Sequence, residues 1–225
     1  MMLCLILLSI ENINMNFINQ RILMLGPHTD DVEFGCGATI VKLFEKKNEI
    51  FCHAFSSAEE SVPQNLPSNI NRQYMFDSLH HLGLDTKNIS IGSYPVRLFS
   101  NFRQKILDDM IYLAKEIKPD IIFIPSTFDT HQDHQVISQE GFRAFKKFIL
   151  LGYEIPWNNL TFRTDAFSIV NHKQVKLKIE ALQCYISQLG RNYITPSYIY
   201  SVAKTRGGQV GKEFAEVFEV IRLIF

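Results

Sequence analysis

The 225-residue sequence predicts a single α/β domain with a mostly parallel sheet and helices on both faces. Short apolar segments alternate with amphipathic segments along the chain, and one of them, 121–124, is apolar at every position. Strands of that kind are typical of a parallel sheet that is covered on both faces. The apolar content of 46% and the charged content of 20% are those of a globular protein, long enough to bury one core.

The first half of the chain alternates regularly between the two kinds of segment. Gly83 ends the second predicted helix, and Pro119 ends the third, whose apolar residues recur at helical spacing. The polar segment 56–67 contains two prolines and is predicted to form a loop over a functional site. The predicted strands are 21–25, 50–55, 89–91 and 121–124, and the predicted helices are 36–47, 68–82 and 101–117.

The second half is less regular. We predict a helix over 135–150, a loop over 151–165, and a strand over 166–170. A further amphipathic helix is predicted for 175–189, where Gly190 ends it. The predicted end of the chain has a strand at 198–203, a flexible Gly207-Gly208 pair and an apolar segment at 214–218.

The N-terminal segment 1–10 is strongly apolar but shorter than the about 20 residues that span a bilayer. It also lacks the basic region and cleavage site of a signal peptide. Met15 begins a stretch that continues directly into the first strand. We therefore predict an extension outside the fold at 1–14, a domain at 15–225 and no integral membrane segment; the alternative for 1–14 is a membrane-peripheral anchor.

Charge and cysteine usage narrow the function classes. The chain has 23 basic and 23 acidic residues and no long basic run, which argues against a nucleic-acid partner. Its four cysteines are scattered and form no C-x-x-C pair. In a chain of this size they indicate reduced thiols and a cytoplasmic location.

A first polar motif lies where the strand at 21–25 turns into the following helix. His28, Asp30 and Asp31 supply an imidazole and two carboxylates within four residues, which suits both a divalent metal and a water-activating base. The alternative is that the two aspartates only cap the helix.

A second motif, His131-Gln132-Asp133-His134, follows the strand at 121–124. Because the carboxyl ends of parallel strands share one edge of a sheet, the two motifs are predicted to meet there. Together they offer two histidines and one carboxylate to a metal and leave a position for water, the pattern of catalytic zinc. Asp30 then accepts the proton of the water, and His131, oriented and kept protonated by Asp133, stabilises the oxyanion.

Both motifs resemble those of the zinc-dependent N-acetylglucosaminyl deacetylases of the PIG-L/LmbE type. The first family motif is His-Pro-Asp-Asp before a glycine-rich stretch, matched by 28–31 and by Gly35-Cys36-Gly37. The second is His-x-Asp-His, matched by 131–134. The resemblance runs from about residue 20 to the C-terminus and implies a Rossmann-like fold. Thr29 replaces the family's proline, from which we expect a less rigid turn.

The resemblance also implies the role of each residue. Zn²⁺ is the expected metal, and Fe²⁺ or Co²⁺ suits the same ligands. Asp30 is the expected base, His131 stabilises the oxyanion or protonates the leaving amine, and Asp133 orients His131. Arg72 is expected to contact the substrate. The implied metal ligands are His28, Asp31 and His134.

The predicted function is hydrolysis of the N-acyl group, above all N-acetyl, of a small amino-sugar substrate. One alternative is an amidase acting on a non-sugar or thiol-glycoside amide. Another is a non-haem Fe(II) oxygenase that uses His131, Asp133 and a distal His172. A third is a carbohydrate-binding protein with a structural metal, and a homo-oligomer stays open in every case.

Overall fold

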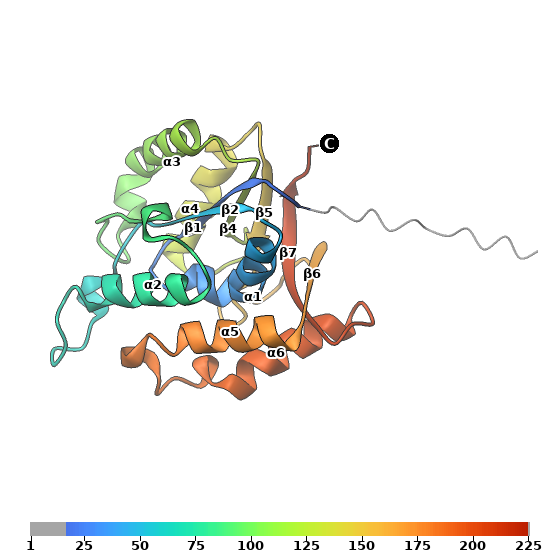
Figure 1. Cartoon of the computed structure of the whole chain (residues 1–225). Coiled ribbons are helices and arrows are strands. Elements are labelled where there is room, and N and C mark those ends of the chain that lie inside the picture. The colour runs from blue at the N-terminus through green and yellow to red at the C-terminus, as the bar shows by residue number, and fades with distance from the viewer. Residues whose placement is uncertain (1–16, 225) are drawn as a thin grey trace, which may run out of the picture.

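The computed structural model describes residues 17–224 and confirms the predicted fold, one α/β domain around a mostly parallel sheet (Figure 1). The predicted extension at 1–14 lies outside the described residues, so its boundary stays a prediction. Within the described part of the chain, no helix combines the length and the apolarity needed to cross a membrane.

The sheet that the described residues form has seven strands in the order β3-β2-β1-β4-β5-β7-β6. The first five in that order are parallel, whereas β7 runs antiparallel to both β5 and β6. The strands are β1 (Arg21–Gly26), β2 (Glu49–Ala54), β3 (Ile89–Ile91), β4 (Ile121–Pro125), β5 (Ile149–Tyr153), β6 (Ala166–Val170) and β7 (Phe214–Arg222).

Helices cover both faces of the sheet, as predicted (Figure 1). Successive side chains of β1 alternate between the two faces. Ile22 and Met24 join a core with α1, α2, α5 and α6, and Leu23 and Leu25 join a core with α3 and α4. The bounds of these helices are α1 (Asp31–Glu45), α2 (Ile70–His81), α3 (Arg103–Ile117), α4 (Gln132–Ala144), α5 (His172–Leu182) and α6 (Pro196–Gly208).

The order of the strands changes direction at β1. From β1 the chain continues to β2 and β3 on one side of the sheet, and it later returns to β4 and β5 on the other side. The loops after β1 and β4 therefore diverge at the carboxyl edge, where sheets of this type bind their ligands. Both polar motifs begin in these two loops and continue into the first turns of α1 and α4.

Three predicted elements are wrong. The helix predicted for 175–189 ends at Leu182 and is followed by a short 3-10 turn at Ile186–Gln188. The helix predicted for 135–150 ends at Ala144, and Ile149–Tyr153 is strand β5, part of which was predicted as a loop. The segment predicted as a strand at 198–203 lies inside helix α6. There, the Thr195 side chain accepts a hydrogen bond from the backbone N–H of Tyr198, and Pro196 takes the first helical turn. This start signal outweighs the strand propensity of the tyrosine-rich segment that follows.

Strand β7 connects the two regions that carry the motifs. Glu216 accepts hydrogen bonds from the backbone N–H groups of Ala38 and Thr39 in α1, at 3.2 and 2.7 Å. Glu219 accepts from the backbone N–H of Thr127 and the hydroxyl of Ser126, at 2.8 and 3.0 Å, in the loop after β4. The last strand therefore holds both site-bearing segments in place.

Candidate metal centre and active site

The local structure of the first motif differs from the prediction. Helix α1 begins at Asp31, five residues earlier than expected, so Asp31 lies in its first turn. Asp30 occupies the N-cap position but makes no side-chain cap hydrogen bond. Capping is therefore not what the Asp30 carboxylate does.

The two motifs meet at the carboxyl edge of the sheet. His28 Nδ1 lies 3.2 Å from Asp31 Oδ2, and His134 Nε2 lies 3.3 Å from Asp31 Oδ1. One donor atom from each of these three residues lies within 4.8 Å of the others, and all three residues are buried. The structure thus assembles the three predicted ligand residues from positions about a hundred residues apart.

Each of the two histidines is held from behind by a carboxylate. Asp133 Oδ2 lies 3.0 Å from His28 Nε2, and Asp129 Oδ2 lies 2.8 Å from His134 Nδ1. A ring nitrogen that donates to a carboxylate leaves the other ring nitrogen with a free lone pair. When a metal replaces the remaining proton, His28 Nδ1 and His134 Nε2 are the atoms whose lone pairs face it beside Asp31, an arrangement that metal-binding histidines commonly show. The residues present therefore fit a divalent metal such as zinc.

The electrostatics of this cluster favour positive charge. Burial lowers the pKa of His28, but Asp31, followed by Asp133, outweighs burial and raises the pKa to about 9. The pKa of His134 likewise rises to about 10, because Asp31 and then Asp129 outweigh burial. Burial raises the pKa of Asp31, yet the two histidines hold it well below its usual range. A cation is therefore stabilised between these side chains.

Asp133 holds His131 through its backbone, and its carboxylate is directed elsewhere. That carboxylate contacts His28 and accepts hydrogen bonds from the backbone N–H groups of Arg97 and Phe99, at 2.6 and 3.3 Å. His131 is held instead by the backbone N–H of Asp133, which donates to His131 Nδ1 at 3.2 Å.

This contact changes the expected state of His131. Because Nδ1 accepts a hydrogen bond, the proton of the neutral ring lies on Nε2. Burial, together with His134 and His28, lowers the pKa of His131. These contacts favour a neutral His131 that donates from Nε2, whereas the sequence predicted an imidazolium.

The segment after α5 supports the first motif. Gln188 Nε2 donates to Asp30 Oδ2 at 2.5 Å, and the Tyr185 hydroxyl contacts the carbonyl oxygen of Thr29. Burial and the Asp31 charge raise the pKa of Asp30, although the Gln188 hydrogen bond lowers it. Sequence reasoning predicted a less rigid turn at Thr29, whereas Tyr185 restrains this buried residue through its carbonyl.

Arg72 does not lie at the cluster. Its Nε lies 3.2 Å from Glu59 Oε1, and its guanidinium also donates to the Gly92 carbonyl at 3.2 Å. Glu59 belongs to the loop predicted at 56–67, and Ser61 and Pro63 of the same loop line the cleft above the cluster. Arg72 thus braces this loop, and its contact with substrate stays a prediction.

The cleft above the cluster has a volume of about 500 Å³ and contains two arginines that the sequence analysis missed, Arg97 and Arg191. Across residues 17–224, neither guanidinium group pairs with a carboxylate. The Arg97 guanidinium donates to Ser61 Oγ at 3.0 Å, and the Arg191 guanidinium contacts the Tyr193 hydroxyl. Arg97 has a left-handed backbone with φ of 69°. This strained conformation directs its N–H to Asp133, and no sequence pattern indicates it.

The glycines of the first motif allow close packing behind the site. A Cβ on Gly37 would lie 2.7 Å from Cγ of Lys178, and a Cβ on Gly35 would overlap the Tyr153 ring. Tyr153 donates its hydroxyl proton to the Leu25 carbonyl at 3.0 Å. The glycines therefore allow α1 to pack closely against β5 and α5.

Comparisons with known proteins agree with this geometry. The family model described as "PIG-L: GlcNAc-PI de-N-acetylase" matches residues 23–145, which include both motifs. A curated protein of Escherichia coli, "Uncharacterized deacetylase YaiS", is 27% identical over 173 residues, covering 73% of this chain and 91% of that protein.

Two solved structures illustrate how widely the fold is used. The N,N'-diacetylchitobiose deacetylase from Pyrococcus horikoshii has a TM-score of 0.74 at 20% identity and covers 90% of this chain and 84% of its own. GalB, a 4-carboxy-2-hydroxymuconate hydratase from Pseudomonas putida, has a TM-score of 0.70 at 16% identity, covering 92% and 98%. At these identities the likeness establishes the fold and leaves the chemistry to the site. Because the family model spans more than half of its length and both motifs, the chain belongs to the PIG-L family of deacetylases.

Proposed function

We propose that the protein is a metal-dependent hydrolase that removes an N-acyl group, above all N-acetyl, from a small amino-sugar substrate. The observation that carries the proposal is the buried cluster of His28, Asp31 and His134, with Asp30 beside it. In the proposal these three residues hold the metal, which is Zn²⁺, or Fe²⁺ or Co²⁺ with the same ligands. When bound, such an ion lowers the pKa of water and polarises a carbonyl oxygen.

Asp30 is the proposed general base. Its raised pKa brings the carboxylate closer to the range in which it both accepts and returns a proton near neutral pH. Asp30 takes one proton from the water that adds to the amide carbon and gives it to the amide nitrogen as the C–N bond breaks. The products are then acetic acid, which ionises to acetate, and the free amine.

His131 is the proposed oxyanion donor. Its Nε2–H donates to the carbonyl oxygen as negative charge develops there, and the Asp133 backbone N–H fixes the ring orientation. Asp133 contributes to the site through both its backbone and its carboxylate, which holds His28.

The names of the related proteins support an amino-sugar substrate. The family model names a GlcNAc de-N-acetylase, the Escherichia coli relative is called a deacetylase, and the Pyrococcus protein is a deacetylase of N,N'-diacetylchitobiose. The polar cleft residues Ser61, Asn158 and Ser187 offer hydrogen-bonding groups that suit sugar hydroxyls. The free thiols of Cys36, Cys52 and Cys184 support the proposed cytoplasmic location.

The oxygenase alternative loses its third ligand. His172 stacks on Tyr200, with ring centroids 5.2 Å apart. In the described chain two groups of residues could hold a metal, and His172 belongs to neither; they are His28, Asp31 and His134, and His28, His131 and Asp133. A structural metal site is closed by four protein ligands, whereas the cluster assembled within 17–224 offers three.

The proposal is tested by measuring acetate release from N-acetylhexosamines, simple, nucleotide-linked and lipid-linked, with chelator and with added zinc. We expect release that chelator abolishes and zinc restores. His134→Ala should lose both bound metal and turnover, whereas His81→Ala, at an exposed ion pair with Glu180, should keep both. Metal-loaded protein without turnover on any N-acylated sugar would contradict the proposal.

A further inference from the structure

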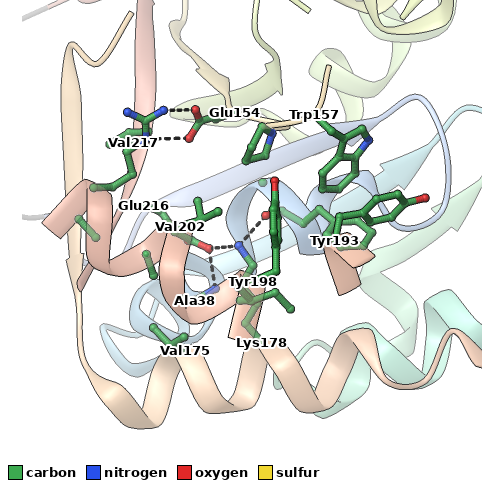
Figure 2. A pocket seen from close by; sticks show the side chains of 17 residues that line it. Ala38, Glu154, Trp157, Val175, Lys178, Tyr193, Tyr198, Val202, Glu216 and Val217 are labelled. Atoms are coloured by element: carbon green, nitrogen blue, oxygen red, sulfur yellow. Dashed lines mark hydrogen bonds and ion pairs between the residues drawn. The ribbon is translucent and has the colours of Figure 1, made fainter. Parts of the chain in front are cut away.

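A second hollow, drawn in Figure 2, shares part of its lining with the cleft. Phe34, Trp157 and Tyr193 line both spaces, so these three rings form the wall between them. Trp157 stacks on Tyr193 with centroids 4.1 Å apart and an interplanar angle of 17°. Phe34 meets Trp157 edge to face at 4.9 Å. We refer to these three residues as the aromatic wall.

The aromatic wall is built from three separate parts of the chain. Phe34 lies in α1 and is buried, Trp157 lies in the connection between β5 and β6, and Tyr193 lies between α5 and α6. Trp157 is 39% exposed, which is high for a side chain of this size between two hollows. Trp157 and Tyr193, both outside the sheet, therefore separate the two spaces together with Phe34 of α1.

The hollow behind the wall offers apolar surface to a ligand. Its charged groups are already paired: Lys178 Nζ lies 2.6 Å from Glu216 Oε1, and Arg206 Nε donates to Glu154 at 3.0 Å (Figure 2). Small aliphatic side chains line much of the rest of the hollow, namely Ala38, Val175, Val202, Ala203 and Val217. A ligand entering this space finds dispersion contacts and no free charge to pair with.

The hollow also lies close to the reacting centre. Phe34 follows the candidate ligand Asp31 by three residues on α1, which places the two about 4.5 Å apart along the helix axis. The hollow has a volume of about 40 Å³, whereas about 10–15 Å³ suffices for one water. A short chain of methylene groups is therefore the kind of occupant that the space fits.

Resting on the function proposed above, we propose that the aromatic wall limits the length of the acyl group, and that the hollow behind it is a site for an apolar acyl chain. The polar side chains and arginines of the cleft face the sugar, so the acyl end of the amide is the part directed to the wall. With the wall closed, acetyl fits. Opening the wall joins the two spaces and admits longer chains.

The first test compares N-acetyl-, N-butyryl- and N-hexanoylglucosamine as substrates. In Trp157→Ala, the ratio of kcat/KM for butyryl over acetyl should rise at least about tenfold, the lower end of what one methylene is worth in an apolar pocket. Refilling the hollow with Val202→Phe in the same chain should reverse the rise. An unchanged ratio in Trp157→Ala, or a wild-type enzyme that already hydrolyses all three equally, overturns the proposal.

A second test does not depend on turnover. Trp157 is the only tryptophan of the sequence, so its fluorescence reports on the wall. Tyr193→Ala opens the wall and retains this reporter. In that variant, N-hexanoylglucosamine should bind at least tenfold tighter than N-acetylglucosamine, and adding Val202→Phe should abolish the difference. Equal affinities overturn the acyl site, whereas binding without hydrolysis in any variant contradicts only the proposed function.

Discussion

Asp133 positions two histidines through two different groups. Its carboxylate lies 3.0 Å from His28 Nε2, and its backbone N–H donates to His131 Nδ1 at 3.2 Å. The carboxylate itself is held by the backbone N–H groups of Arg97 and Phe99. One residue therefore connects a candidate metal ligand, the proposed oxyanion donor and the strained backbone at Arg97.

Asp133→Asn should weaken metal binding while the fold persists. The Asn amide oxygen is uncharged, so it accepts the hydrogen bond from His28 less strongly than the Asp carboxylate does. Loss of such a partner typically costs 10–100-fold in metal affinity. Competition with a chelator of known zinc affinity measures the change. Asp108→Asn, on the exposed face of α3, is the control and should bind zinc as the wild type does. Equal affinities for both variants would remove Asp133 from the metal site.

Asp30→Asn should keep the metal and lose turnover. The amide side chain retains the size of the carboxylate but cannot accept the proton, so kcat should fall about 10²–10⁴-fold. Metal content and kcat measured on the same preparation separate the two properties. If this variant loses its zinc, Asp30 is a ligand and the assigned roles of Asp30 and Asp31 are wrong.

Tyr185→Phe should destabilise the protein because Tyr185 has one hydroxyl proton and two buried partners, the Thr29 carbonyl and Glu33 Oε1. A carbonyl oxygen only accepts, so the Tyr185 hydroxyl donates its proton to the Thr29 carbonyl. Removing the hydroxyl takes this donor away from the buried carbonyl. The expected loss is about 1–3 kcal/mol in the free energy of unfolding, measured with urea. A loss below the lower end of that range would show that the turn is held by other contacts.

Glu33→Gln should be tolerated, for the same reason. The Glu33 contact with Tyr185, at 2.7 Å, needs a donor on Glu33 once Tyr185 donates to Thr29. Burial agrees, because it raises the pKa of Glu33 to about 8. A neutral amide also donates, so the urea midpoint should stay near that of the wild type. A drop as large as that of Tyr185→Phe would mean that Glu33 is ionised.

His53 should make the protein less stable in mild acid. Burial lowers its pKa to about 4, below the ordinary value of 6.5, so the folded state favours the neutral ring. The contribution of neutral His53 to the free energy of unfolding is present above pH 6.5. It is lost as the pH falls towards 4, because the histidine of the unfolded state takes up a proton at a higher pH than that of the folded state. In His53→Gln, the fall in melting temperature between pH 7 and pH 5 should be smaller than in the wild type. An identical fall in both proteins contradicts this account.

The sequence predicted the position of the site better than its internal contacts. The apolar segments at 21–25 and 121–124 are strands, and the motifs after them meet because parallel strands end at one edge. Local pattern suffices for that argument. The segment 149–153 was misjudged because it is too short for its periodicity to separate a buried strand from a helix.

The contacts that the sequence did not predict are long-range. Gln188 donates to Asp30, 158 positions away in the sequence. The Asp133 carboxylate contacts His28, 105 positions away, and not the nearby His131. Asp129 lies two residues before the second motif, yet only the geometry shows that it holds His134. The hydrogen-bond partner of a side chain depends on the direction in which that side chain points in the folded protein. A pattern of residue types along the sequence does not specify this direction.

Strand β7 also determines when the centre can form during synthesis. Every candidate metal ligand lies before residue 135, but Glu216 and Glu219 hold α1 and the loop after β4 from the far end of the chain. A nascent chain that has already presented all its ligands therefore still lacks the strand that fixes their spacing. Assembly of the centre therefore needs the last strand, and a chain cut before residue 214 carries both motifs but lacks the contacts that hold them.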